Sequence, residues 1–410
     1  MTALLELLIF KSALAWVLMG ASLLVLVFLP KLLGLNFLNG MLNAQITLFF
    51  NILTMVGGLD ADLIDSGRIV HFFVIEFGFL VAILLTYRWA LRYRLHVLGA
   101  LQRFFNGNGA YLLTAFMGLL TAFNFVEAPS DGSSRIEYMT QGWFSLLKPL
   151  IQIATPLSYL GVFMLLLNPR RKMLGYLLLV ISILANVATG SKASFLLSLG
   201  FAYLAVRDLT AGQKIAMTKT ERTVIVAFTG LAAVIALSHL AVDASDLLDR
   251  FFLYGEANIL TYFSPDPTAA CSNVSLFAAM HRGWARLLGD SSALDIDTLF
   301  GFALMIQETG VNTLTGPNAR LSAYFLCNFP DARIVFGLID VAFYLLLIRS
   351  SFSQAVRHPK ILAVFYPFML ASLYGASQDF NLIMQDITIM CGLIIAFTIA
   401  QFVPFRARHA

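Results

Sequence analysis

GPNARLSAYFLCNFPDARIVFGLIDVAFYLLLI (residues 316–348) holds the pattern that decides the fold. It starts with a Gly-Pro-Asn turn, continues into a short apolar segment that stops at Pro330, and ends in a long apolar run. We interpret it as a turn, a short helix, a joint broken by proline and a membrane-spanning helix. Asn318 and Arg320 stand where the turn enters the short helix.

Long apolar runs recur along the whole chain. Of its 410 residues, 59% are hydrophobic and only 12% are charged, whereas soluble chains carry about 25% charge. Because a helix needs ~20 apolar residues to cross the hydrocarbon core, we predict an all-α, polytopic integral membrane protein with about 11 or 12 transmembrane helices. The predicted spans are 12–30, 34–57, 69–87, 109–126, 147–167, 173–189, 193–206, 223–241, 333–348, 361–376 and 384–403, and residues 2–10 or part of the long loop would supply a twelfth.

The second span contains several amide side chains. Because amides are costly against lipid, we expect this span to turn them toward the bundle interior or a wet cavity. They are Asn36, Asn39, Asn43, Gln45 and Asn51.

Basic residues indicate how the chain is oriented. Most of the 27 lysines and arginines fall in the loops 86–96, 168–172, 207–222, 349–360 and 406–408, which the positive-inside rule places in the cytoplasm. We therefore predict three parts: an N-terminal transmembrane bundle (1–241), a large periplasmic loop with interfacial helices (242–332), and C-terminal transmembrane helices (333–410). The formal charge of +4 is spread over short loops, so we expect no nucleic-acid partner.

Several basic residues run against this bias on the predicted outer face. Arginines beside apolar spans need an anionic partner to offset their desolvation. The outward set is Lys192, Arg250, Arg282, Arg286, Arg320 and Arg333.

Two of these cations stand in short, distinctive motifs. In ATGSKASFLLSLG (188–200), Lys192 lies where a tight turn leads into a helix, which suits a phosphate; a lysine reaching to the lipid interface is the alternative. In DLLDRFFLYGEANIL (246–260), Arg250 is a candidate anion ligand and Glu256 a candidate general base. An ion pair on the membrane surface would also explain this second motif.

Polar residues elsewhere on the outer face offer acid–base and sugar-binding groups. In AAMHRGWARLLGD (278–290), His281 suits acid–base chemistry and Arg282 suits phosphate, although a headgroup-facing basic helix fits equally. Asn318, Asp379 and Asn381 suit sugar hydroxyls, with helix capping as the alternative.

The three cysteines exclude a disulfide scaffold and a CxxC metal site. Cys271 and Cys327 both fall in the predicted periplasmic loop, so one bridge is open there if that side is oxidising.

Two stretches resemble the bacterial O-antigen polymerase and ligase superfamily. TGSK (189–192) before a Leu-rich span is similar to the family's TGS-basic signature, and residues 316–344 resemble its later turn, helix and core span. The predicted number of spans and the large periplasmic loop late in the chain are also similar to the plan of this family. The motif-level match covers only about 50 residues, and lysine replaces the more usual arginine at Lys192.

The resemblance implies a Wzy-type glycosyltransferase with a fold similar to that of C-type glycosyltransferases. Such an enzyme of the bacterial inner membrane joins undecaprenyl-pyrophosphate-linked oligosaccharide repeat units at the periplasmic face. Its product is O-antigen or capsule, and its expected partners are membrane lipid and a chain-length regulator protein. Because a glycosyl pyrophosphate donor is already activated, we expect metal-independent transfer without a cofactor, and attack opposite the leaving group predicts inversion. The resemblance also maps the family's basic residues to Lys192 and Arg250.

Two other functions stay open from the sequence. An O-antigen ligase would transfer polymer to lipid A-core, but Asn318 replaces the histidine that ligases carry at this turn. A lipid-linked oligosaccharide transporter or flippase would show internal repeats and charges at the midplane. We find no clear repeat, and the charges collect at the outward ends of the spans.

Overall fold

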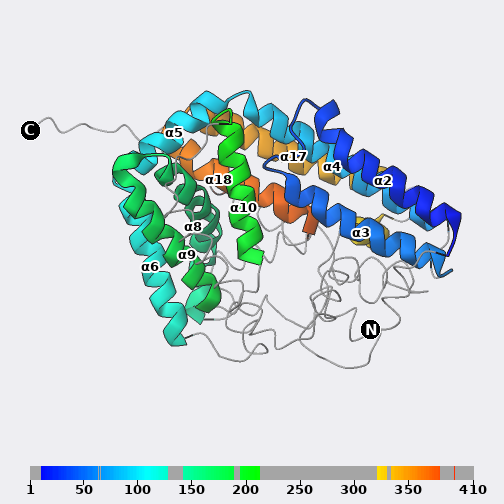
Figure 1. The fold of residues 1–410 in the computed structure, drawn as a ribbon, viewed down its shortest axis with the longest axis horizontal. Helices are drawn as coiled ribbons and strands as arrows, with labels where there is room; N and C mark the ends of the chain where they lie inside the picture. Colours follow the sequence, from blue (N-terminus) through cyan, green and yellow to red (C-terminus); the bar gives the residue numbers. More distant parts are fainter. Residues whose placement is uncertain are drawn as a thin grey trace, which may run out of the picture.

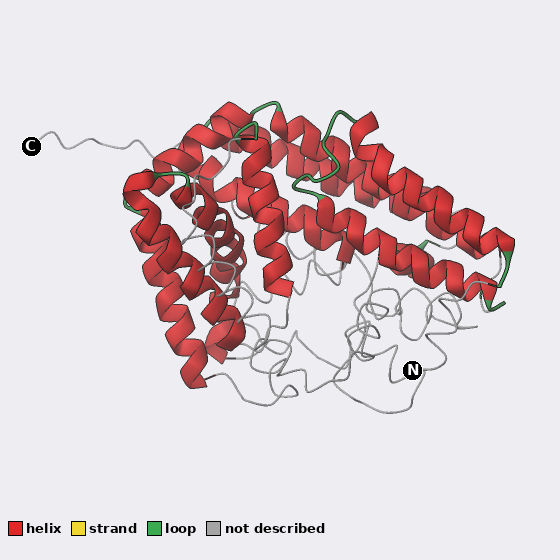
Figure 2. Cartoon of the chain, viewed as in Figure 1, coloured by secondary structure: helices red, strands yellow, loops and turns green. Residues whose placement is uncertain are grey.

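The computed structural model describes residues 11–62, 64, 66–127, 142–188, 194–212, 321–329, 334–378 and 392. Every regular element within these ranges is a helix (Figure 2). Six of the helices are long and apolar enough to cross a membrane, so this part of the chain forms a multi-pass membrane protein. The elements are α2 (Ala13–Leu32), α3 (Leu42–Asp60), α4 (Ser66–Leu91), α5 (Arg94–Asn106), α6 (Gly109–Glu127), α8 (Gly142–Leu166), η1 (Pro169–Arg171), α9 (Lys172–Ala188), α10 (Ser194–Leu209), α16 (Leu321–Asn328), α17 (Ile334–Val356) and α18 (Pro359–Gln378).

The helices form two groups joined by α18 (Figure 1). In the first group α2 packs on α3 and α3 on α4, while α17 packs on α4. In the second, α9 packs on both α6 and α8, and α10 packs on α8. Helix α18 contacts α3 and α17 in the first group and α8 in the second, so one continuous bundle results.

The predicted spans mostly coincide with helices. Ranges 12–30, 69–87, 109–126, 147–167, 173–189, 193–206, 333–348 and 361–376 each fall largely or wholly within one described helix. The chain bends by 120° at a short break between α8 and α9, and the two helices pack against each other. The predicted spans 223–241 and 384–403 and the segment 2–10 lie outside the described residues, except for Gly392.

The predicted start of the second span is wrong. The helix begins at Leu42 rather than at residue 34, because the chain first forms a turn with Gly34 at a φ of +71°. A left-handed conformation of this kind suits glycine and ends helix α2. Asn36 is therefore exposed on the turn, whereas Asn39, Asn43, Gln45 and Asn51 are buried as expected.

Helix α5 was not among the predicted elements. It begins at Arg94, within the predicted basic loop 86–96, and continues to Asn106. Val97, Leu101 and Phe105 recur every four residues and are buried, while Leu95 and Arg103 are exposed. This stripe packs on α18, α6 and α8. The short helix is thus an amphipathic element whose apolar side closes one end of the bundle.

The short helix and span predicted within 316–348 are confirmed. Helix α16 covers Leu321–Asn328, and α17 begins at Ile334 after the Pro330 joint. Although α16 belongs to the predicted loop 242–332, its residues Leu321–Phe325 are buried among the spans.

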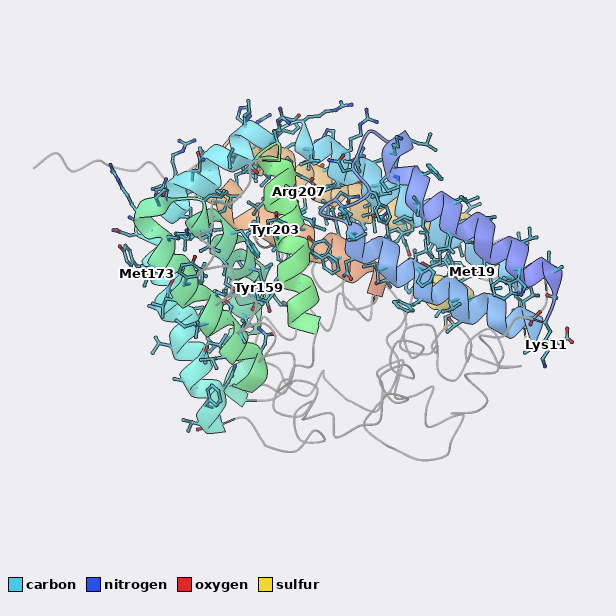
Figure 3. The ribbon with its side chains drawn as sticks, in the orientation of Figure 1. Lys11, Met19, Tyr159, Met173, Tyr203 and Arg207 are labelled. Atoms are coloured by element: carbon cyan, nitrogen blue, oxygen red, sulfur yellow. The ribbon has the colours of Figure 1, made fainter. Side chains whose placement is uncertain are left out.

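The basic loops meet at one end of the bundle. Asp208 of α10 accepts hydrogen bonds from the Tyr87 hydroxyl (2.7 Å) and the Gly40 backbone N–H (2.9 Å). Arg207 donates to the Leu38 carbonyl, and lies at the upper end of α10 in Figure 3, far from Lys11 at the outer end of α2. Asp208 follows the predicted span 193–206; burial raises the pKa of its carboxyl, while Tyr87 and Gly40 act in the opposite direction.

The basic loops at 168–172 and 349–360 join this end through further contacts, whereas 213–222 and 406–408 lie outside the described residues. Asn168 donates to the side chain of Asn106 (2.7 Å), and Arg171 donates to the Gly107 carbonyl (3.0 Å). The Arg349 guanidinium lies 5.6 Å from the Trp89 ring centroid. The described basic loops thus lie at the same end of the bundle, as the charge pattern predicted.

Replacing Gly40 by alanine should destabilise the bundle by about 1–3 kcal/mol, because no room exists for a side chain. A Cβ there would lie 2.9 Å from Tyr87 Cζ and 3.1 Å from Ala205 Cβ, and it would push apart α4 and α10. Thermal unfolding of the protein in detergent measures the change. Gly20→Ala is the control, since Gly20 has no atoms near its Cβ position; equal melting temperatures for the two variants would contradict this packing.

Candidate functional site at helix α16

All predicted site residues lie outside the described part of the chain, so their roles stay predictions. They are Lys192, Arg250, Glu256, His281, Arg282, Asn318, Arg320, Asp379 and Asn381. Three described helices adjoin them in sequence: α10 begins at Ser194, α16 begins at Leu321, and α18 ends at Gln378. The positions of these three helices therefore show where the predicted site residues attach to the bundle.

Helix α18 contacts both of the other two helices. The rings of Phe201 on α10 and Tyr374 on α18 lie 5.9 Å apart, and α16 contacts α18 directly. Each of these helices borders a different predicted motif. Their association is the geometric reason for treating α16 and its neighbours as the candidate site.

A buried carboxylate holds the start of α16. Glu76 of α4 is 4% exposed and accepts a hydrogen bond from the Ser322 backbone N–H (3.2 Å). The first N–H groups of a helix have no partner within the helix and carry a partial positive charge. A carboxylate at this point satisfies one of them and is itself stabilised within an apolar span, where a lone charge is costly.

A second carboxylate holds the middle of α16. Asp340 of α17 accepts a hydrogen bond from the Tyr324 hydroxyl (3.0 Å). Gly337, one turn earlier on α17, lets Phe325 and Phe329 approach closely: a Cβ there would lie 2.5 Å from Phe325 and 2.7 Å from Phe329. Helix α16 is therefore fixed by polar contacts from two different spans and by aromatic packing.

Cys327 near the end of α16 is disulfide-bonded. The other cysteines, Cys271 and Cys391, lie outside the described residues, so the predicted Cys271–Cys327 pair stays a prediction. Stable disulfides are typical of oxidising compartments.

The side-chain amides of the second span differ in whether they form hydrogen bonds within the protein. Asn39 donates to Gln45 Oε1 (3.3 Å), and Gln45 donates to the Leu26 carbonyl (3.0 Å). Asn51 is fully buried, yet among the described residues neither its Nδ2 nor its Oδ1 has a hydrogen-bond partner. A buried amide of this kind is rare and calls for an explanation.

Sequence reasoning missed Glu76, Asp340 and the distinct state of Asn51. The signal for the carboxylates was present, because an acidic residue inside an apolar span is by default a functional candidate. Nothing in the sequence separated Asn51 from the other amides.

The described residues contain no group of three or more His, Cys, Asp or Glu side chains that would hold a metal ion. The site elements that they do contain are carboxylates and amides buried between helices. These groups bind and orient hydroxyls and backbone N–H groups.

Comparison of the chain with protein-family models, with curated proteins and with solved structures found no match.

Glu76→Ala should destabilise the protein by about 1–3 kcal/mol, because it leaves the Ser322 N–H buried without its acceptor. Glu76→Gln keeps an acceptor oxygen and should lose less. Thermal unfolding in detergent, with limited proteolysis to follow α16, measures both variants. If Glu76→Ala matched the parent protein in both measurements, α16 would not depend on this bond.

Proposed function

We propose that the protein is an oligosaccharide repeat-unit polymerase of the bacterial inner membrane. It joins lipid-linked units of O-antigen or capsule on undecaprenyl pyrophosphate at the periplasmic face. The observation that carries the proposal is the similarity of residues 189–192 and 316–344 to the O-antigen polymerase and ligase superfamily. The placement of α16 among three spans is compatible with a site built next to the turn that carries Asn318 and Arg320.

The proposed reaction needs no activation by the enzyme, because a glycosyl pyrophosphate is already activated. A hydroxyl of the acceptor sugar attacks the anomeric carbon of the donor. The new glycosidic C–O bond forms as the bond to the pyrophosphate oxygen breaks, and undecaprenyl pyrophosphate leaves with the electron pair. The hydroxyl proton passes to a base, for which Glu256 and His281 are the candidates. Attack opposite the leaving group inverts the anomeric carbon.

Catalysis would then rest on positioning and on charge stabilisation. Lys192, Arg250, Arg282 and Arg320 are the candidates to neutralise the leaving pyrophosphate, and Asn318, Asp379 and Asn381 to orient the sugars. Amide and carboxylate groups suit hydroxyls, whereas guanidinium groups suit phosphate.

Two features favour a periplasmic site. The basic loops gather at the end of the bundle that contains Asp208, which the positive-inside rule assigns to the cytoplasm. The disulfide at Cys327 favours an oxidising compartment for the C-terminal end of α16, and in a Gram-negative cell this compartment is the periplasm.

The orientation gives a labelling prediction. Asp62 and Gln102 are both exposed, and they lie beyond the end of α3 and within α5, respectively. In spheroplasts, a membrane-impermeant maleimide should label Asp62→Cys and leave Gln102→Cys unlabelled until the membrane is opened. The reverse pattern would place the basic loops outside and would remove the topological support for a periplasmic site.

Loss of the protein should leave a lipopolysaccharide or capsule with a single repeat unit, because units are made but not joined. Lys192→Ala and Arg250→Ala should each fail to restore the polymer ladder while reaching the membrane at the parent level. Gel banding of the polysaccharide and immunoblotting of membranes measure these effects. Lys31→Ala, on the opposite face, is the matched control and should restore the ladder.

Three other outcomes of the same experiment would contradict the proposal. Polymer that is made but not attached to lipid A-core would indicate a ligase. Unchanged banding in the deletion strain would exclude both enzymes. A normal ladder from both Lys192→Ala and Arg250→Ala would exclude the charge stabilisation assigned to them.

A further inference from the structure

Asn51 stands out among the buried polar side chains of α3. Thr54, on the next turn, donates its hydroxyl to the carbonyls of Phe50 (3.0 Å) and Asn51 (2.9 Å). Asn39 and Gln45 satisfy each other and the backbone, as described above. Asn51 has no exposed surface, and neither of its side-chain polar atoms has a hydrogen-bond partner in the described part of the chain. Leaving such an amide unsatisfied costs free energy that a leucine in its place would not cost.

Asn51 shares a face of α3 with Gly58. It lies seven residues before Gly58, and residues spaced by two helical turns share one face of a helix. The Cβ position of Gly58 is 2.8 Å from Ile64 Cδ1, in the turn that leads into α4. The face of α3 that carries Asn51 therefore packs, near the end of the helix, on the turn that leads into α4.

Asn51 also lies at the depth of Glu76. At a rise of 1.5 Å per residue, Asn51 is about 14 Å before the end of α3 at Asp60, and Glu76 is about 15 Å after the start of α4 at Ser66. Because the two helices are antiparallel neighbours, these distances place both polar residues in one layer across the hairpin. Glu76 in turn contacts the start of α16.

We propose that Asn51 is a binding residue for sugar hydroxyl groups of the lipid-linked substrate, in an intramembrane polar layer that it forms with Glu76. The inference rests on the proposed polymerase function and assigns this layer to the sugar rather than to the pyrophosphate. An amide offers two donors and an acceptor, which match a hydroxyl group that both donates and accepts. The Glu76 carboxyl oxygens accept hydrogen bonds, as the bond from the Ser322 N–H shows, so they suit hydroxyl donors.

The layer is distinct from the predicted cationic residues, none of which belongs to α3 or α4. It would therefore orient the sugar while the basic residues hold the charged leaving group. Since Asn51 is enclosed, side chains around it must move for a sugar to reach it. Hydrogen bonds between the sugar and the unpaired amide would offset the free-energy cost of that movement.

The test compares Asn51→Leu with Thr54→Val, a buried neighbour on the same helix whose hydroxyl bonds only its own helix. Asn51→Leu should melt at the same temperature as the parent protein or higher, and polymer length in a complemented deletion strain should fall at least tenfold. Thr54→Val should restore the ladder. Purified undecaprenyl-pyrophosphate-linked oligosaccharide should raise the melting temperature of the parent and of Thr54→Val, and not that of Asn51→Leu.

Each other result overturns the inference. Parent-level polymer from Asn51→Leu would show that the amide holds only water or nothing. A lower melting temperature for Asn51→Leu would show that the protein itself satisfies the amide. Failure of the polymerase proposal is separate, because it appears as a deletion strain with normal polymer before any variant is compared. In that case, an equal melting shift of parent and Asn51→Leu by the lipid-linked oligosaccharide would still reject the inference.

Discussion

Glu76 is a carboxylate inside an apolar span, and its hydrogen bond to the Ser322 N–H fixes where α16 enters the bundle. Membrane interiors provide no water to solvate such a group, so the carboxylate needs partners within the protein. The start of a helix supplies one, because its N–H groups are unpaired and positively polarised. One hydrogen bond thus satisfies both the carboxylate and the helix start, and a second carboxylate, Asp340, accepts a hydrogen bond from the Tyr324 hydroxyl of α16.

The position of α16 links the architecture to the proposed chemistry. A helix of eight residues has little stability of its own, so its place depends on α4, α17 and α18 around it. Helix α16 follows Asn318 and Arg320 directly in the sequence, so these spans hold the element next to the predicted turn. We infer that the polar contacts on α16 join the transmembrane bundle to the proposed site, so that the bundle positions the site as well as holding the protein in the membrane.

Much of the fold could be predicted from the sequence because lipid imposes simple requirements. Apolar length predicted helices α2, α6 and α9 to within about two residues at each end, and it predicted the start of α17 but ended it eight residues before Val356. Charge bias predicted that the basic loops would share one end. The prediction was wrong at residues 34–41, where Gly34 ends a helix by a local conformation that hydropathy does not register. It missed α5 as well, because a basic segment with a buried stripe resembles a loop when only its charges are considered.

The candidate site was less predictable than the fold. The contacts of Glu76, Asp340 and Asn51 depend on which helices become neighbours, and span patterns carry little information on that point. Glu76 was visible as an acidic residue in an apolar run, but its partner is 246 residues away in the chain. The roles of Lys192, Arg250 and the other predicted residues rest on motifs and charge, and they stay predictions.

The central claim is that this protein forms glycosidic bonds between lipid-linked repeat units, and reconstitution tests it most directly. Purified protein in proteoliposomes would be given undecaprenyl-pyrophosphate-linked oligosaccharide in EDTA, without nucleotide. Mass spectrometry of the lipid-linked products would follow chain length and free undecaprenyl pyrophosphate. The account predicts oligosaccharides extended by whole repeat units, with one undecaprenyl pyrophosphate released for each bond formed. Substrate that only crosses the membrane, or stays one unit long, would contradict it.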